Sequence, residues 1–245
     1  MLTKIESRKL VVISDLHLGN PFSNARHHIS KFLKWAADNN FDICINGDGL
    51  EIAQASFRKI AQDLPEVFQT LSSISKKGRK TYYIVGNHDM VLEHFLQDWG
   101  AFKVSPFLNV RSGSKRIRIE HGHLYDPKFV KNPALYEFLT WLGGFALGVH
   151  PQLYRVWIWW EKMKSRMRAR KTGIIGEPPE FREAASELLR RGFDTIIFGH
   201  THHPGEVPIG TQGMYLNSGS WLLGNHYIEI IDGNVELKIW NKDAA

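Results

Sequence analysis

The chain has 245 residues, a hydrophobic content of 43% and a formal net charge of +6. This length fits one α/β domain with an inserted element better than two independent domains. The single cysteine, Cys44, excludes an internal disulfide. The most apolar longer stretch, residues 138–149, is well short of the ~20 residues that span a bilayer. Residues 1–9 show no secretory signal, so we expect a cytoplasmic protein that meets a membrane only at its surface.

Strands and helices are predicted to alternate in the first half of the chain. Apolar, β-branched runs predict strands at residues 10–13, 41–45 and 81–85. Helical spacing of apolar residues predicts helices at residues 29–38, 57–77 and 90–98. Within the second of these helices we expect Pro65 to mark a break or a first turn.

The second half repeats this order after a long interruption. We expect strands at residues 116–120 and 195–198, a helix at residues 180–191, and antiparallel strands from residue 214 onward. Turns are predicted at Gly219 and at Asp232-Gly233. A repeated unit of strand, polar cluster and helix predicts an α/β sandwich whose polar clusters gather at one edge.

Five predicted strands end in residue types that bind metals. These ends are Asp15-Leu16-His17, Asp48, Asn87-His88, His121 and His200-Thr201-His202. Residues i and i+2 of an extended chain point to the same side, so Asp15 and His17 can reach one metal together. Taken singly, each has an ordinary explanation, because Asp15 could cap a helix and Asn87 could form a turn. Their joint occurrence at strand ends favours a metal site.

The ligand types indicate a particular chemistry. Carboxylate and imidazole ligands suit Mn, Fe or Zn better than Ca or Mg alone. A carboxylate shared by two ions, which we assign to Asp48, holds them ~3.5–4 Å apart. A water between such ions loses its proton near neutral pH and becomes a nucleophile, while the ions polarise phosphoryl oxygens.

In order and spacing, five motifs resemble those of the calcineurin-like metallophosphoesterases: Asp-Leu-His-Leu-Gly, Gly-Asp, Gly-Asn-His-Asp, His-Gly-His and Gly-His-Thr-His. The resemblance runs from Leu10 to about Trp221, apart from a basic segment. It implies a four-layer α/β/β/α sandwich with an inserted helical cap. It also implies two divalent ions, which we expect to be Mn, with Fe and Zn as alternatives.

The resemblance also implies a role for each motif residue. One metal would be bound by Asp15, His17, Asp48 and His202. The other would be bound by Asp48, Asn87, His121 and His200. His88 would steady the phosphoryl oxygens or protonate the leaving group, and Asp89 would orient His88.

Residues 125–171, called the insert below, interrupt the pattern within an expected single domain of residues 1–245. The insert carries nine Lys or Arg against three acidic residues and four of the eight tryptophans, so it accounts for the whole net charge. Its apolar stripe would share one helix face and consists of Leu153, Val156, Trp157, Trp160, Met163 and Met167. This composition is typical of an interfacial membrane helix. The alternative is a cap helix whose stripe packs on the core, and both can hold together.

A basic, aromatic helical cap after the His-Gly motif is similar to that of the UDP-2,3-diacylglucosamine pyrophosphohydrolases of lipid A biosynthesis. In those enzymes the cap holds acyl chains, and a Mn-dependent reaction gives UMP and 2,3-diacylglucosamine 1-phosphate. The resemblance implies a lipid-linked pyrophosphate substrate, met at the inner face of the cytoplasmic membrane. It points to four substrate-binding residues, Trp157, Trp160, Arg166 and Arg170.

Two departures and two alternatives stand beside this interpretation. Those enzymes typically carry Arg where this chain has His88, and an aromatic residue where it has Ile52-Ala53-Gln54. One alternative is a soluble phosphodiesterase or phosphatase acting on nucleotides, nucleic acid or phosphoprotein, since basic charge with aromatic residues also suits single strands. The other is a non-catalytic scaffold, against which the complete ligand set argues.

Overall fold

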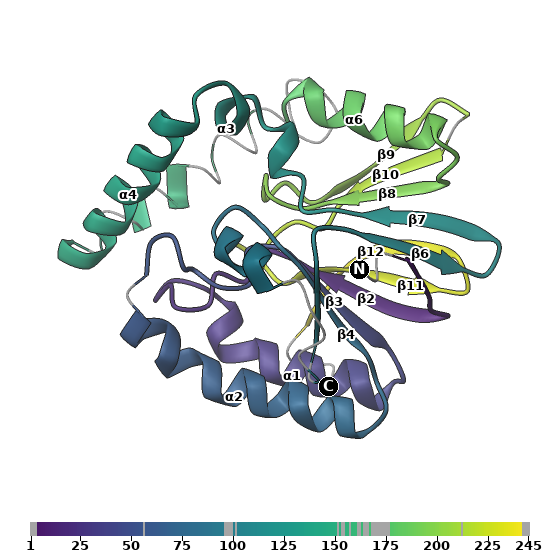
Figure 1. The fold of residues 1–245 in the computed structure, drawn as a ribbon, viewed down its shortest axis with the longest axis horizontal. Helices are drawn as coiled ribbons and strands as arrows, with labels where there is room; N and C mark the ends of the chain where they lie inside the picture. Colours follow the sequence, from purple (N-terminus) through teal and green to yellow (C-terminus); the bar gives the residue numbers. More distant parts are fainter. Residues whose placement is uncertain are drawn as a thin grey trace.

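A computed structural model describes residues 4–241, apart from residues 56, 96–99, 101, 151, 153–154, 157, 161–162, 164–166, 168–176 and 212. Within these residues, the strands form two six-stranded sheets (Figure 1). The first sheet has the order β12-β11-β2-β3-β4-β5. Its members are β2 (Lys9–Ile13), β3 (Asp42–Asn46), β4 (Thr81–Ile84), β5 (Lys103–Ser105), β11 (His226–Ile231) and β12 (Asn234–Ile239).

The second sheet has the order β1-β6-β7-β8-β10-β9. Its members are β1 (Lys4–Glu6), β6 (Leu108–Ser112), β7 (Lys115–Ile119), β8 (Thr195–Phe198), β9 (Gly205–Ile209) and β10 (Gly213–Asn217). Strands β2 to β5 run parallel in the first sheet, and β7, β8 and β10 run parallel in the second. Each sheet therefore gathers several carboxyl ends of strands at one edge.

Helices cover the outer face of each sheet. Helices α1 (Ala25–Asp38) and α2 (Phe57–Lys76) lie on the first sheet, and α6 (Pro179–Arg190) lies on the second (Figure 1). The four layers α/β/β/α confirm the predicted sandwich. Four further helical elements are η1 (Met90–Phe95), η2 (His123–Tyr125), α3 (Pro127–Lys131) and α4 (Pro133–Val149).

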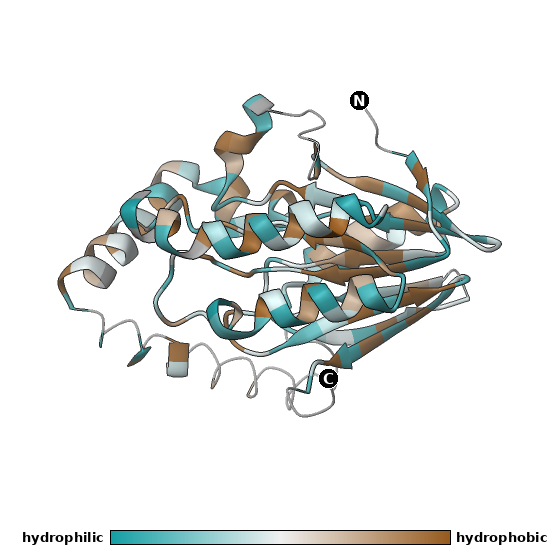
Figure 2. Ribbon diagram, turned by 90° about the horizontal axis from the view of Figure 1, so that it is seen from below, coloured by the Kyte–Doolittle hydropathy of each residue, from teal (hydrophilic) through white to brown (hydrophobic). Residues whose placement is uncertain are grey.

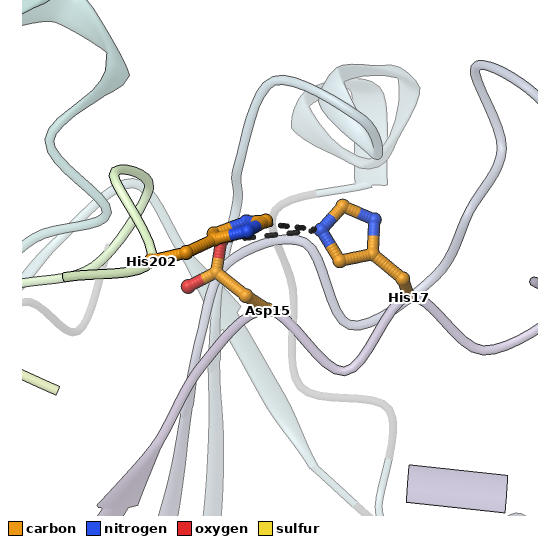
Figure 3. A group of neighbouring side chains, drawn as sticks. All are labelled: Asp15, His17 and His202. Carbon is orange, nitrogen blue, oxygen red and sulfur yellow. Dashed lines mark hydrogen bonds and ion pairs between the residues drawn. The ribbon is translucent and has the colours of Figure 1, made fainter. Parts of the chain in front are cut away.

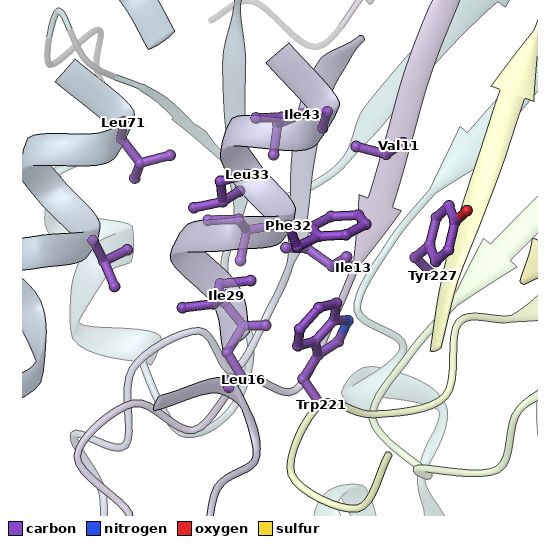
Figure 4. Packing of buried hydrophobic residues seen from close by; sticks show 14 of the residues in the cluster. Val11, Ile13, Leu16, Ile29, Phe32, Leu33, Ile43, Leu71, Trp221 and Tyr227 are labelled. Atoms are coloured by element: carbon purple, nitrogen blue, oxygen red, sulfur yellow. The ribbon is translucent and has the colours of Figure 1, made fainter. Parts of the chain in front are cut away.

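Strand β2 shows why the layers form. Alternate side chains of a strand point to opposite faces. Leu10 and Val12 pack between the two sheets, whereas Val11 and Ile13 pack toward α1. Figure 4 shows the helix side of this packing, where Phe32 of α1 lies 5.0 Å from Trp221 between ring centroids. In Figure 2, apolar residues are concentrated in the strands behind α1 and α2.

Several sequence predictions need correction. Pro65 lies inside α2 and does not break it, because its ring is on the exposed side, where water can solvate the unpaired carbonyl of the preceding turn. The expected helix at residues 90–98 is a 3₁₀ helix that ends at Phe95, and residues 96–98 lie outside the described part. Strands β1, β5, β6 and β9 were not predicted, because each is only three to five residues long and lacks the continuous apolar, β-branched run on which the strand predictions were based.

None of the described helices is long and apolar enough to cross a membrane. The longest apolar helix of the insert, α4, spans 17 residues. An α-helix needs ~20 predominantly apolar residues to span the hydrocarbon core.

Candidate metal centre

The seven residues expected to bind metal follow the carboxyl ends of five strands. They are Asp15 and His17 after β2, Asp48 after β3, Asn87 after β4, His121 after β7, and His200 and His202 after β8. Strands β2 to β4 are parallel neighbours in the first sheet, and β7 and β8 are parallel neighbours in the second. The structure brings all seven together at one edge of the sandwich.

The backbone at this edge turns sharply. Left-handed φ values occur at five of the seven residues: 54° at Asp15, 45° at His17, 50° at Asp48, 64° at His200 and 60° at His202. This conformation costs an L-residue roughly 1 kcal/mol or more. Asp and His adopt it more readily than most residues, and such strain is concentrated at functional sites. The turns are therefore a feature of the site and not of the strands that precede it.

Two glycines allow the loops to approach each other. A Cβ on Gly47 would lie 2.3 Å from Nδ1 of His121, and a Cβ on Gly86 would lie 2.2 Å from Oδ1 of Asp48. Neither distance is compatible with a side chain larger than hydrogen. Glycine at both positions is required for His121 and Asp48 to reach the shared edge.

Asp15, His17 and His202 form the first ligand group (Figure 3). Nε2 of His202 lies 2.9 Å from Oδ1 of Asp15 and 3.4 Å from Nε2 of His17. Oδ1 of Asp15 is buried yet has no hydrogen-bond partner of good geometry. A buried carboxylate oxygen that faces two imidazole nitrogens fits a divalent cation better than it fits any proton arrangement.

Asn87, His121 and His200 form the second ligand group. Oδ1 of Asn87 lies 2.8 Å from Nδ1 of His200 and 3.2 Å from Nε2 of His121. Asp48 lies between the two groups, because its Oδ2 is 3.3 Å from Nε2 of His121 and 3.9 Å from Nε2 of His17. This is the position that a carboxylate shared by two ions needs.

The protonation states of Asp48 and His200 suit a metal. Burial opposes ionisation of Asp48, but the charges of His121 and His88 hold its pKa well below the ordinary value. Burial lowers the pKa of His200, which favours the neutral imidazole that a metal requires. His121 differs, because burial opposes its protonation but the carboxylates of Asp48 and Asp15 raise its pKa to about 9, so an ion that binds there displaces a proton from it.

His88 is held by a buried carboxylate that is not among the site residues expected from the sequence. Nδ1 of His88 lies 2.5 Å from Oε1 of Glu51, and Nδ1 of His17 lies 2.6 Å from Oε2 of the same residue. Glu51 is fully buried and therefore links a candidate ligand to the candidate catalytic histidine. His88 is also close enough to His17 and Asp48 to belong to a third possible group of metal-binding atoms. Its Nε2 is the nitrogen that remains for other contacts.

Asp89 has different contacts from those expected. Its Oδ2 accepts hydrogen bonds from Tyr83 Oη at 2.5 Å and from the backbone N–H of Gly49 at 2.9 Å. Its Oδ1 accepts from the backbone N–H of Gly86 at 2.7 Å. Asp89 thus fastens the loops after β3 and β4 to each other, while Glu51 is the carboxylate that contacts His88. The expected partner was wrong because spacing along the chain does not reveal a side chain's direction.

A family model described as Calcineurin-like phosphoesterase matches residues 8–204. The chain belongs to this family. It is therefore a metal-dependent phosphoesterase, and the matched segment contains all seven candidate ligands, His88 and the whole insert. The family uses divalent metals, in agreement with the ligand types at the shared edge.

This phosphoesterase is similar in sequence to two curated hydrolases and in fold to a solved phosphatase. A UDP-2,3-diacylglucosamine hydrolase of Azotobacter vinelandii is 25% identical over 229 residues, which cover 86% of this chain and 90% of the relative. A protein of the same name from Pseudomonas putida is 24% identical over 207 residues, covering 80% and 82%. Among solved structures, a dimetal phosphatase from Danio rerio has a TM-score of 0.54 at 10% identity, covering 94% and 95%. That likeness shows the fold alone.

The insert of this phosphoesterase touches the metal centre at two points. Nε2 of His200 lies 3.0 Å from Oδ2 of Asp126, and Nδ2 of Asn87 donates to Tyr136 Oη at 2.8 Å. Asp126 also caps α3 by accepting from the N–H of Lys128 at 2.9 Å. No motif among the expected site residues pointed to Asp126 or Tyr136.

Glu177, just after the insert, forms a second support for the metal-binding loop. Its carboxylate accepts from Thr201 Oγ1 at 2.7 Å, from Tyr215 Oη at 2.8 Å and from Asn217 Nδ2 at 2.6 Å. Asn217 also donates to the carbonyl of Gly199 at 2.8 Å. This network supports the loop that carries His200 and His202. None of the sequence motifs indicates it.

The residues expected to bind substrate are largely beyond what the structure describes. Trp157, Arg166 and Arg170 lie outside the described residues. Trp160 is helical and 45% exposed. A surface hollow of about 450 Å³ at the amino ends of β2 and β3 is lined by charges such as Arg8 and Asp232, which pair at 2.8 Å, and contains none of the candidate ligands.

Proposed function

We propose that this phosphoesterase hydrolyses a lipid-linked nucleotide pyrophosphate of the UDP-2,3-diacylglucosamine type at the membrane face. Water would add across the phosphorus–oxygen–phosphorus bridge and release UMP and an acylated sugar 1-phosphate. The observation that carries the proposal is the orientation of α4, which contacts the metal centre through Tyr136 and exposes apolar side chains on its opposite side.

Helix α4 is amphipathic in the reverse sense from a core helix. The side that meets the body of the protein is polar or small: Gln54 Nε2 donates to the carbonyl of Thr140 at 3.2 Å, and Gly143 and Gly144 lie against Gln54. The opposite side is apolar and 44% to 60% exposed, with Leu135, Phe138, Leu139, Trp141, Leu142, Phe145 and Val149. Contiguous exposed apolar surface of this kind marks a binding site for lipid or protein.

Most of the described residues of the apolar stripe are exposed too. Val156 is 61% exposed, Trp160 45% and Met167 52%, whereas Met163 is half-buried. The interpretation in which the stripe packs on the core is therefore not supported for the three exposed residues. Apolar side chains left in water favour acyl chains or the acyl region of a bilayer as their partner.

The position of α4 links this surface to the site of chemistry. Tyr136 lies near the amino end of α4 and contacts Asn87 through its hydroxyl group. Phe138, two residues later, already belongs to the exposed face. A substrate that carries a pyrophosphate and acyl chains could thus place the pyrophosphate at the metal centre and the acyl chains on α4.

Each residue of the centre has a proposed part in hydrolysis. Two divalent ions, when bound, polarise phosphoryl oxygens and lower the pKa of water, and Mn, Fe and Zn all suit the mixed nitrogen and oxygen ligands. Asp48 would hold both ions at a fixed separation. Glu51 would keep the Nδ1 proton of His88, which leaves Nε2 free to steady a phosphoryl oxygen or to protonate the leaving group.

The names of the relatives support the substrate class only weakly, since identities are 25% or less. The presence of His88 where those enzymes typically carry Arg favours a substrate pose of its own. A hydrolase of soluble phosphodiesters remains the competing function, because the metal centre by itself would suit either substrate.

The test compares three substrates with the Mn-loaded full chain: UDP-2,3-diacylglucosamine, the same nucleotide sugar without acyl chains, and bis-p-nitrophenyl phosphate. We expect kcat/KM for the acylated substrate to exceed both others by at least about a hundredfold, because two buried acyl chains contribute several kcal/mol. Release of UMP identifies the scissile bond. Equal or higher kcat/KM for the soluble diester would overturn the lipid assignment and leave the competing function.

A further inference from the structure

The insert reaches the second ligand group but makes no such contact with the first within the described residues. Asp126 contacts His200, and Tyr136 contacts Asn87. The supports of the first group come from the body of the protein instead: Glu51 contacts Nδ1 of His17. The two halves of one metal centre therefore differ in what holds their ligands.

We infer that Asp126 and Tyr136 are positioning residues that make binding of the second metal ion depend on the docked helices α3 and α4, while the first ion binds without them. This inference rests on the proposed two-ion function and deepens it, because it gives the insert control over completion of the centre. The ligands under control are Asn87 and His200; Asp48 and His121 are fixed by the sandwich.

The contact of Asp126 fixes the tautomer of His200. A carboxylate oxygen 3.0 Å from Nε2 requires a proton on that nitrogen, so the lone pair stays on Nδ1. Nδ1 is the nitrogen that faces Asn87 and the ligand group. Carboxylates that hold a metal-binding histidine in this way raise its basicity and its affinity for the ion.

The contact of Tyr136 fixes the amide of Asn87. Its hydroxyl oxygen accepts from Nδ2, which keeps the carbonyl oxygen Oδ1 turned toward His121 and His200. The ring of Tyr136 is itself held by Phe129 of α3, with centroids 5.2 Å apart, and Phe129 packs on His123 at the same distance. An undocked insert would free both ligands together.

Coupling of this kind acts in both directions. If the docked insert raises affinity for the second ion, the second ion must stabilise the docked insert by the same factor. The centre would then be complete only when α4 lies beside it. In protein with only the first ion bound, α3 and α4 would be held less tightly against the metal centre.

The experiment titrates Mn²⁺ into metal-stripped full chain by calorimetry. Wild type should bind two ions, and Asp126→Asn and Tyr136→Phe should each weaken one of them by about 10- to 100-fold while leaving the other unchanged. Asparagine retains the oxygen that caps α3 but cannot accept the His200 proton. Tyr125→Phe is the matched control, since its hydroxyl donates to Glu120 at 3.0 Å, away from the ligand groups.

A second readout follows the coupled partner. Hydrogen exchange in α4 should slow when Mn²⁺ is added to wild type and should respond less in Tyr136→Phe. Electron paramagnetic resonance should show an interacting Mn pair in wild type and a single-ion spectrum in the variants at limiting Mn²⁺. A role in folding alone would weaken both ions alike.

Each outcome decides between the claims. Two ions bound unchanged by both variants, or equal weakening of both ions, would overturn the inference and leave the proposed function intact. Fewer than two ions in wild type would overturn both. Selective loss of one ion in both variants, with Tyr125→Phe unaffected, supports it.

Discussion

The loops that carry the candidate metal ligands differ from the insert in the kind of side chain they bury. The loops after the strands bury charged and polar groups, which is costly unless each is paired. They meet this cost with left-handed turns, close glycines and carboxylate–imidazole contacts. The insert does the reverse, because α4 exposes apolar side chains and turns its small and polar face inward.

The contrast with α1 makes the second point plain. Helix α1 buries Ile29, Phe32 and Leu33 against the first sheet, as an ordinary amphipathic helix does. Helix α4 has stronger apolar character and yet leaves that character in water. An apolar face therefore does not by itself reveal its partner. In α1 the partner is the sheet, whereas the apolar face of α4 is exposed.

The largest expected effect is on the buried charges of the loops. Asp48→Ala should abolish binding of both ions and lower turnover of bis-p-nitrophenyl phosphate by at least about 10³-fold, equivalent to ~4 kcal/mol of transition-state stabilisation. Metal content by mass spectrometry and turnover measure the two effects. Asp38→Ala is the control, because that carboxylate is exposed at the surface and pairs with Lys77. One ion retained by Asp48→Ala would show that Asp48 is not shared.

A somewhat smaller effect should follow from loss of His88. His88→Ala should keep both ions and lose about 10²- to 10⁴-fold in kcat, the usual contribution of general acid–base catalysis. The exposed His27 on α1 gives the matched control His27→Ala. Loss of an ion from His88→Ala would assign His88 to the ligands, a role that its position near His17 and Asp48 also allows.

The loops could be predicted from sequence far better than the insert. Ligand types at strand ends carry a local signal, and that signal found all seven candidate ligands. Asp15 and His17 do not follow the extended-chain geometry that was expected of them, because both residues have left-handed φ values. Contacts across long separations carry no local signal: Glu51 meets His17 from 34 positions away, and Tyr136 meets Asn87 from 49. Asp89 was assigned to the wrong partner for this reason.

The orientation of α4 could not be predicted from the hydrophobic pattern of the sequence either. Hydrophobic periodicity gives the faces of a helix but not which face meets the protein. Pro65 illustrates the same gap, since its effect on α2 depends on whether its side of the helix is exposed. Tertiary context decides both.

Glu177 lies where the insert rejoins the loops, and its effect should appear in the pH dependence of stability. Burial raises its pKa to about 7, although Thr201, Tyr215 and Asn217 donate to it. Between its unfolded pKa of ~4.3 and about 7, the folded state keeps a proton that the unfolded chain has lost. Stability therefore falls as pH rises through this window, by a few kcal/mol in total.

Glu177→Gln should remove this slope, because glutamine stays neutral. Urea unfolding of metal-free protein at pH 5, 6, 7 and 8 measures the free energy of unfolding in both proteins. The difference between them should grow with pH up to about 7 and then level off. Glu183→Gln on α6 provides a control with the same change of side chain. Parallel curves would show that Glu177 ionises normally.

The smallest expected effect concerns the exposed face of the insert. Trp141 is 60% exposed and stacks on Phe138 and Phe145 with centroids 6.1 Å and 6.0 Å apart, so it is the centre of an aromatic ridge. Trp141→Gln should weaken binding to vesicles of phosphatidylglycerol and phosphatidylcholine about tenfold. Full burial of a large apolar side chain contributes ~1.5–3 kcal/mol, and a ridge that reaches only the interface realises part of it.

The same substitution should leave the loops untouched. Turnover of the soluble diester and the free energy of unfolding should match wild type, because Trp141 points away from the body of the protein, while Glu137→Gln on the same helix should change neither vesicle binding nor turnover. Wild-type vesicle binding in Trp141→Gln, or binding of oligonucleotides in place of vesicles, would mean that the exposed face meets something other than lipid. The aromatic ridge would then require another partner with an apolar surface, because removing these rings from water is what favours binding.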